Sequence, residues 1–71
     1  MHTAHTSSNT LHTLHRRYAA RWGKVWPFTD DFLAELWQEA KETAGYNRGA
    51  GRNRAEAYEH CLIAMRETHE F

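Results

Sequence analysis

Hydrophobic residues recur along the chain at the spacing of one helix face, in three separate segments. In the first segment they lie three or four positions apart, at Leu11, Leu14, Tyr18 and Trp22. Because an α-helix has about 3.6 residues per turn, this spacing places the side chains on one side of a helix. The pattern predicts a helix over about residues 10–22, capped at Asn9 and ended by Gly23, since glycine adopts the left-handed conformation of a helix end at little cost.

Two further segments show the same spacing and carry their own start and stop signals. The second helix is predicted over about residues 29–44, with Thr29 as its N-terminal cap and Gly45 as its end. Its apolar positions are Phe32, Leu33, Leu36, Trp37, Ala40 and Ala44. The third helix is predicted over about residues 53–69, beginning at Asn53. Its inward positions are Ala55, Tyr58, Cys61, Leu62 and Met65, extending to His69.

The pattern as a whole predicts an all-α fold, a compact three-helix domain over residues 10–71. Residues 1–9 show no apolar periodicity and predict a flexible tail rich in His, Thr and Ser. A chain of 71 residues has room for one domain. Because so short a chain buries only about 60 % of its unfolded surface, we expect dense aromatic packing and homodimer formation to support the core. The core is predicted to bring together Leu14, Tyr18, Leu36, Trp37, Leu62 and Met65.

Composition excludes several classes of protein. Lys and Arg number 9 and Asp and Glu number 9, so the net charge of zero excludes a wholly basic arm and a wholly acidic mimic. A single cysteine excludes an internal disulfide framework. The longest apolar run, Cys61 to Met65, is too short to span a membrane. The first fifteen residues also lack the apolar stretch of a secretory signal, and we therefore expect a cytoplasmic location.

Charge is distributed unevenly along the chain. Residues 1–27 hold four basic residues and no acid, whereas residues 28–71 hold nine acids and five basic residues, a net of −4. We favour an interpretation in which the basic first helix pairs with the acidic helices, because a neutral protein gains little non-specific affinity for phosphate. An acidic face docked on a basic partner is a further possibility. The alternative is that the basic helix and the Arg/Gly loop contact phosphates, through Arg16, Arg17, Arg21, Arg48, Arg52 and Arg54.

The residues that could support catalysis or metal binding form no complete site. Histidines occur in pairs three apart, but a structural zinc needs four ligands and Cys61 is the single thiol. The Gly49–Gly51 segment lacks the third glycine of a dinucleotide fingerprint, since position 54 is arginine, and it lacks a P-loop lysine. Cys61 lies on the apolar stripe, where a buried and inert thiol is the common case. We expect no enzymatic activity, no cofactor and no metal.

Aromatic residues outside the helical stripes indicate a binding surface. Trp26 and Phe28 lie in the connector after Gly23, Tyr46 and Arg48 lie in the glycine-rich loop, and Ile63 lies among acids on the third helix. Trp, Tyr and Arg dominate binding hot spots, and connectors carry function more often than packing. An alternative role for Trp26 and Phe28 is to cover the small core.

The function expected from the sequence is that of a small, non-enzymatic protein-binding module. Such a module could regulate or inhibit a larger protein, in the manner of a phage or mobile-element accessory protein. The alternative is a nucleic-acid-binding regulator that uses the basic first helix and the Arg/Gly loop.

Overall fold

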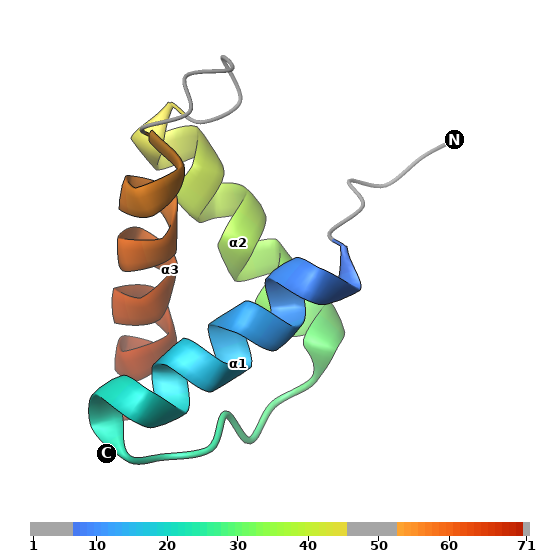
Figure 1. Ribbon diagram of the computed structural model, residues 1–71, viewed down its shortest axis with the longest axis vertical. Helices are drawn as coiled ribbons and strands as arrows, with labels where there is room; N and C mark the ends of the chain where they lie inside the picture. Colours follow the sequence, from blue (N-terminus) through green and yellow to red (C-terminus); the bar gives the residue numbers. More distant parts are fainter. Residues whose placement is uncertain (1–6, 46–52, 71) are drawn as a thin grey trace.

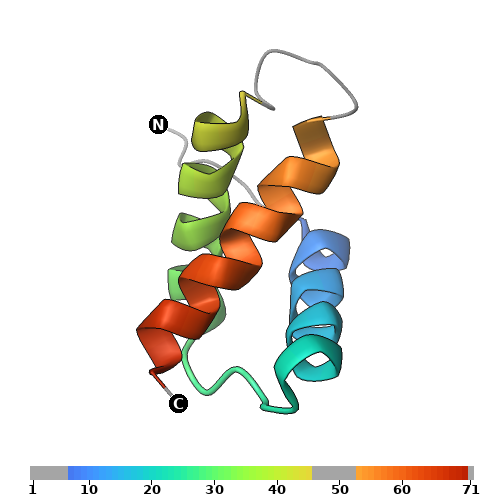
Figure 2. The same ribbon diagram turned by 90° about the vertical axis from the view of Figure 1, so that its left-hand side faces the viewer.

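Three helices follow one another in the computed structural model, which describes residues 7–45 and 53–70: α1 (Ser8–Trp22), α2 (Asp30–Ala44) and α3 (Asn53–His69). α2 and α3 meet at one end and splay apart toward the other, and α1 lies across the open end (Figure 1). Turned by 90°, the view shows α3 in front with α1 and α2 on either side of it (Figure 2). The predicted all-α fold is confirmed, since the described residues contain no strand.

Side-chain caps start the first two helices. The Thr29 hydroxyl oxygen accepts a hydrogen bond from the backbone N–H of Phe32 at 3.2 Å, as the sequence predicts for α2. In α1 the cap is Ser7, whose hydroxyl oxygen accepts from the backbone N–H of Thr10 at 3.2 Å. The predicted start at residue 10 is therefore wrong by two residues, because Ser7 caps the helix as well as Asn9 would have done. Residues 1–6 of the predicted tail lie outside the described residues.

Glycines end the same two helices in the left-handed conformation, as predicted. Gly23 has φ of 69° and Gly45 has φ of 73°. The backbone N–H of Gly23 donates to the Ala19 carbonyl at 2.8 Å. At the end of α2, the side-chain amide of Asn53 donates to the Ala44 carbonyl. This hydrogen bond joins the start of α3 to the end of α2, and it satisfies a carbonyl that the helix itself leaves without a partner.

The core lies where the three helices and the connector meet. Most of the residues predicted to form the core are buried. The prediction for Leu36 is wrong, because its side chain is only partly buried against the core, whereas Leu33 on the same helix is fully buried. On α3, Ala55 is exposed and Ala57 is buried, because that helix packs against both others and presents a wider inward face than one stripe. The buried residues are Leu14, Tyr18, Trp26, Leu33, Trp37, Ala40, Ala44, Ala57, Tyr58, Cys61, Leu62 and Met65.

The connector between α1 and α2 covers one end of the core with Trp26, which is 4 % exposed. Its ring meets the Tyr18 ring edge-to-face at 5.8 Å and the Phe28 ring at 5.0 Å. Such edge-to-face pairs add stability beyond the area they bury. None of the described helices is long and apolar enough to cross a membrane.

Candidate functional site

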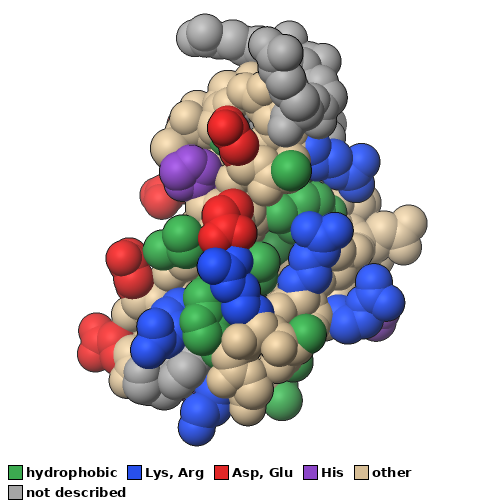
Figure 3. Space-filling model, turned by 60° about the vertical axis from the view of Figure 1, so that its left-hand side comes forward, with side chains coloured by type: hydrophobic (Ala, Val, Ile, Leu, Met, Phe, Trp, Pro, Cys, Tyr) green, Lys and Arg blue, Asp and Glu red, His purple; other side chains and the backbone are tan. Residues whose placement is uncertain are grey.

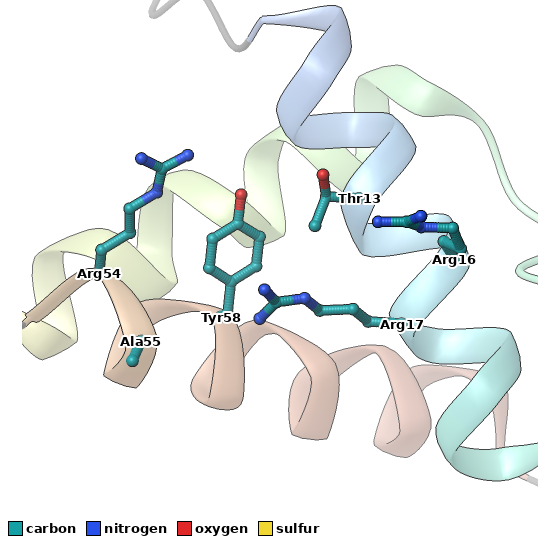
Figure 4. A pocket seen from close by; sticks show the side chains of 6 residues that line it. All are labelled: Thr13, Arg16, Arg17, Arg54, Ala55 and Tyr58. Atoms are coloured by element: carbon teal, nitrogen blue, oxygen red, sulfur yellow. The ribbon is translucent and has the colours of Figure 1, made fainter.

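A surface cleft of about 340 Å³ lies between α1 and the first turns of α3. α1 forms one wall and α3 forms the other, so residues far apart in the sequence face each other across it (Figure 4). The lining is polar and basic, with one alanine. The residues that line the cleft are Thr13, Arg16, Arg17, Arg54, Ala55 and Tyr58.

Three arginines bring their guanidinium groups to this cleft from both walls. Arg16 and Arg17 project from the middle of α1, and Arg54 projects from the second position of α3 (Figure 4). Arg54 also lies in the first turn of its helix, where the helix dipole favours anions. The fold therefore gathers three of the six predicted phosphate contacts at one place.

Tyr58 forms the floor of the cleft. Its side chain is 5 % exposed, and its ring lies 4.7 Å from the Trp37 ring in the core. The guanidinium carbon of Arg17 lies over the same ring at 4.5 Å from its centroid, and that of Arg54 lies at 5.8 Å. Contacts of this kind between a guanidinium and an aromatic face hold an arginine in place. Tyr58 thus positions two of the three cations.

The two hydroxyls of the cleft differ in their hydrogen bonding. The Tyr58 hydroxyl points into the open space between Arg54 and Thr13 (Figure 4), and no other described residue forms a hydrogen bond with it. The Thr13 hydroxyl donates to the Asn9 carbonyl at 2.9 Å, which uses its only proton. The Tyr58 hydroxyl therefore remains available as a donor to a ligand.

Carboxylates contact two side chains of α1 that lie outside the lining of the cleft. Arg21 Nη1 lies 2.7 Å from Glu59 Oε1, and this hydrogen bond raises the pKa of Arg21 and lowers the pKa of Glu59. His15 Nε2 likewise lies 2.9 Å from Asp30 Oδ1. The predicted pairing of the basic helix with the acidic helices is therefore present at one ion pair, Arg21 with Glu59, and the His15 contact is a hydrogen bond. Among the described residues, no carboxylate lies within 4.0 Å of Arg16 or Arg17.

The molecular surface separates the two signs of charge. α1 contains no acidic residue, whereas the exposed faces of α2 and α3 carry most of the acids. In Figure 3 the acidic side chains gather toward the left and middle of the face, and the Lys and Arg side chains gather toward its right and lower parts. Among the described helices, α1 is therefore the one whose surface carries basic side chains and no acid.

The structure describes three of the five residues predicted to bind a protein partner. Trp26 is buried and packs within the domain, which supports the alternative that it covers the core. Phe28 is 43 % exposed in the connector and Ile63 is 41 % exposed on α3. Tyr46 and Arg48 lie outside the described residues, and so does Arg52, a predicted phosphate contact.

The remaining chemistry-bearing groups of the described residues are the Cys61 thiol and the dispersed His, Asp and Glu side chains. Cys61 is fully buried, and burial raises the pKa of its thiol to about 12, so it stays protonated at neutral pH. Within residues 7–45 and 53–70, no three His, Cys, Asp or Glu side chains lie close enough to hold a metal ion. The cleft is consequently the part of the described structure with the most specific chemistry.

Sequence analysis identified the arginines of the cleft but missed Tyr58. This residue lies on the apolar stripe of α3 and was assigned to the core, which is correct for its ring. The direction of its hydroxyl depends on how α1 crosses α3, and no pattern along the chain shows that crossing.

Comparison with known proteins gives no match to a family model, a curated protein or a solved structure.

Proposed function

We propose that the chain is a small, non-enzymatic nucleic-acid-binding protein whose cleft contacts backbone phosphates. The observation that carries this proposal is the convergence of Arg16, Arg17 and Arg54 on one hollow beside the Tyr58 hydroxyl. The guanidinium group presents a rigid fork of donors that matches phosphate oxygens, and arginine is the residue most used for this purpose.

Phosphate fits the cleft better than a carboxylate does. A carboxylate is planar and is satisfied by one guanidinium fork, whereas the oxygens of a phosphate point in tetrahedral directions. Cations that approach from α1 on one side and from α3 on the other match a tetrahedral anion (Figure 4). Nucleic acid is therefore favoured over an acidic peptide as the partner.

The zero net charge of the chain limits how much of its surface can bind nucleic acid, but it is compatible with binding at the cleft. α1 carries no acid along its whole length, so the cleft continues into a basic surface. The acidic faces of α2 and α3 confine a polyanion to that surface, and the affinity for nucleic acid is expected to be local and sensitive to salt.

Binding of a labelled single-stranded oligonucleotide tests the proposal directly. We expect fluorescence anisotropy to show binding at 50 mM salt that weakens as salt is added. Arg17→Gln and Arg54→Gln should each weaken it roughly tenfold, because a hydrogen bond to a charged group contributes about 1.5–3 kcal/mol. Arg66→Gln is the matched control, since Arg66 is an exposed arginine of α3 outside the cleft. Absence of binding by the native chain, or an equal loss in the control, would refute the proposal.

A protein partner is the second candidate, and the exposed apolar side chains of the connector favour it. Val25 is 76 % exposed and Phe28 is 43 % exposed, three positions apart. A second copy of the chain, or a larger protein that the chain regulates, could cover these side chains. In this second candidate function the chain would act in the cytoplasm as a regulator or inhibitor, in the manner of a phage accessory protein. A melting temperature that rises with protein concentration, and loses that dependence in Val25→Ser, is expected for the homodimer. A monomer by sedimentation at high micromolar concentration would exclude the homodimer.

A further inference from the structure

We infer that the cleft takes the terminal phosphate monoester of a single-stranded nucleic acid, and that the protein thereby recognises a phosphorylated end. This inference rests on the proposed function and specifies its ligand. Three features of the cleft support it: its charge, its buried tyrosine and its size.

The charge of the cleft matches a monoester better than an internal phosphodiester. A phosphate monoester carries a charge of about −1.5 to −2 at neutral pH, whereas each internal phosphodiester carries about −1. The monoester also presents three terminal oxygens where the diester presents two. Arg16, Arg17 and Arg54 supply three guanidinium groups around one hollow, so each can face one oxygen of the monoester.

Tyr58 adds a donor whose position is fixed by the core. Its ring is held between Trp37 and the guanidinium groups of Arg17 and Arg54. Its side chain is more than nine-tenths buried, and its hydroxyl points into the cleft with no hydrogen-bond partner among the described residues. A polar group held in this way exchanges its hydrogen bond to water for one to the arriving anion, and it gives up little side-chain entropy in doing so.

The dimensions and surroundings of the cleft limit the ligand to an end. A volume of about 340 Å³ exceeds what a phosphate fills and lies at the small end of ligand pockets, so there is room for the attached nucleotide. Beyond Arg54, α3 carries the exposed acids Glu56 and Glu59, the second of them paired with Arg21, and it offers a continuing backbone no further arginine until Arg66. The strand can leave along α1, where His12 and Arg16 are separated by one helical turn and no acid intervenes.

A phosphorylated peptide is a less suitable occupant. Ala55 is the only aliphatic side chain in the lining, so the described cleft has no apolar pocket for the side chains beside a phosphorylated residue. The basic surface of α1 matches a ligand that carries further phosphates. Nucleic acid is the macromolecule that combines a terminal monoester with additional anionic groups.

The experiment compares one eight-nucleotide single strand in three forms: with a 5′ phosphate, with a 3′ phosphate and with hydroxyl groups at both ends. We expect one phosphorylated form to bind the native chain at least tenfold more tightly than the hydroxyl form. Equal affinity for all three forms would overturn the inference while the proposed function stands. Absence of binding by every form at 50 mM salt would overturn both.

Two variants test the geometry of the site. Tyr58→Phe keeps the ring and removes only the hydroxyl, so it should reduce the preference for the phosphorylated end to about threefold or less with an unchanged melting temperature. Arg54→Gln, at an exposed position, should reduce the same preference, and Arg66→Gln should preserve it. A preference that survives both Tyr58→Phe and Arg54→Gln would overturn the assignment of the cleft. A phosphoserine peptide of equal length that binds as tightly as the phosphorylated strand would overturn the choice of nucleic acid.

Discussion

The Tyr18 hydroxyl lies 2.6 Å from Nδ1 of His69, and this hydrogen bond joins the middle of α1 to the last turn of α3. Tyr18 is fully buried, and burial raises the pKa of its hydroxyl. The rings of Trp22 and Trp26 lie 5.4 Å and 5.8 Å from its own. A buried hydroxyl costs stability unless it is hydrogen-bonded, so the partner at His69 secures the most deeply buried polar group of the aromatic cluster.

Replacing His69 should therefore destabilise the domain more than replacing a partly exposed residue without such a hydrogen bond. We expect His69→Ala to lower the free energy of unfolding by about 1–3 kcal/mol, because it removes a short hydrogen bond from the buried Tyr18 hydroxyl. His60→Ala is the control, since His60 is exposed on the same helix. Urea denaturation of both variants measures the difference, and equal stabilities would show that the Tyr18 hydroxyl does not depend on His69.

Cys61 makes the domain sensitive to alkaline pH. Burial raises the pKa of its thiol from 9.0 to about 12, so between these values the unfolded chain loses a proton that the folded chain keeps. The contribution of the protonated thiol to the free energy of unfolding is fully present below pH 9. It falls by about 1.4 kcal/mol per pH unit as the pH rises toward the pKa of the folded state. We expect Cys61→Ala to be less stable at pH 8 but to lose about 2 kcal/mol less than the native chain between pH 8 and pH 10.5. Parallel losses in urea denaturation would contradict this.

The two left-handed glycines should differ in their tolerance of alanine. Both positions impose a strain of about 1–2 kcal/mol on a residue with a side chain. At Gly45 an added Cβ would also lie 3.2 Å from Nδ2 of Asn53, whereas at Gly23 nothing lies within 4 Å. Gly45→Ala should consequently lower the melting temperature more than Gly23→Ala, and the opposite order would indicate that the Asn53 hydrogen bond to α2 is unimportant.

Leu33 and Leu36 test which face of α2 supports the core. Leu33 is fully buried and Leu36 is partly buried. Truncation of a buried leucine to alanine costs about 2–5 kcal/mol, a large share of the total stability of a small domain. We expect Leu33→Ala to approach global unfolding and Leu36→Ala to remain folded, as judged by circular dichroism and urea denaturation. Equal destabilisation would show that the inward face is centred between the two residues.

Salt dependence reports how many phosphates the protein neutralises. For a single strand, the logarithm of the binding constant falls with the logarithm of salt concentration with a slope of about −0.7 per phosphate contact. A single terminal phosphate shared by the three arginines should give a slope of roughly −0.7, each further phosphate that contacts α1 should add about the same amount, and Arg16→Gln should make the slope shallower. A slope independent of this substitution, in an otherwise binding-competent variant, would place the contact elsewhere on the surface.

Local chemistry made much of the fold predictable. Thr29, Gly23 and Gly45 occupy the cap positions that their side chains or backbone freedom predict, because a cap depends on residues within one turn of it. The start of α1 was less certain, since Ser7 and Asn9 are both suitable caps. Leu36 and Ala55 were assigned incorrectly for a different reason: which residues of a helix face inward depends on the angle at which its neighbours cross it.

The candidate site was less predictable than the fold. The sequence shows that arginines are concentrated on the first helix and around the loop, but the meeting of Arg17 with Arg54 over the Tyr58 ring requires α1 to pack beside α3. Trp26 illustrates the converse case. Its position in a connector left two roles open, an exposed binding anchor or a cover for the core, and its ring fills the space between α1 and α2.

Tyr58 belongs to the core through its contact with Trp37 and to the cleft through its contact with Arg17. α1 packs less extensively on the other helices than they pack on each other, so it is the element whose opening costs least. A ligand seated between Arg17 and Arg54 would hold α1 against α3. Ligand binding in the cleft and packing of α1 against α3 are therefore thermodynamically linked. A ligand at one hundred times its Kd would stabilise the state in which α1 is packed against α3 by about 2.7 kcal/mol. Slower hydrogen exchange of the α1 amides is the expected signature of a filled cleft.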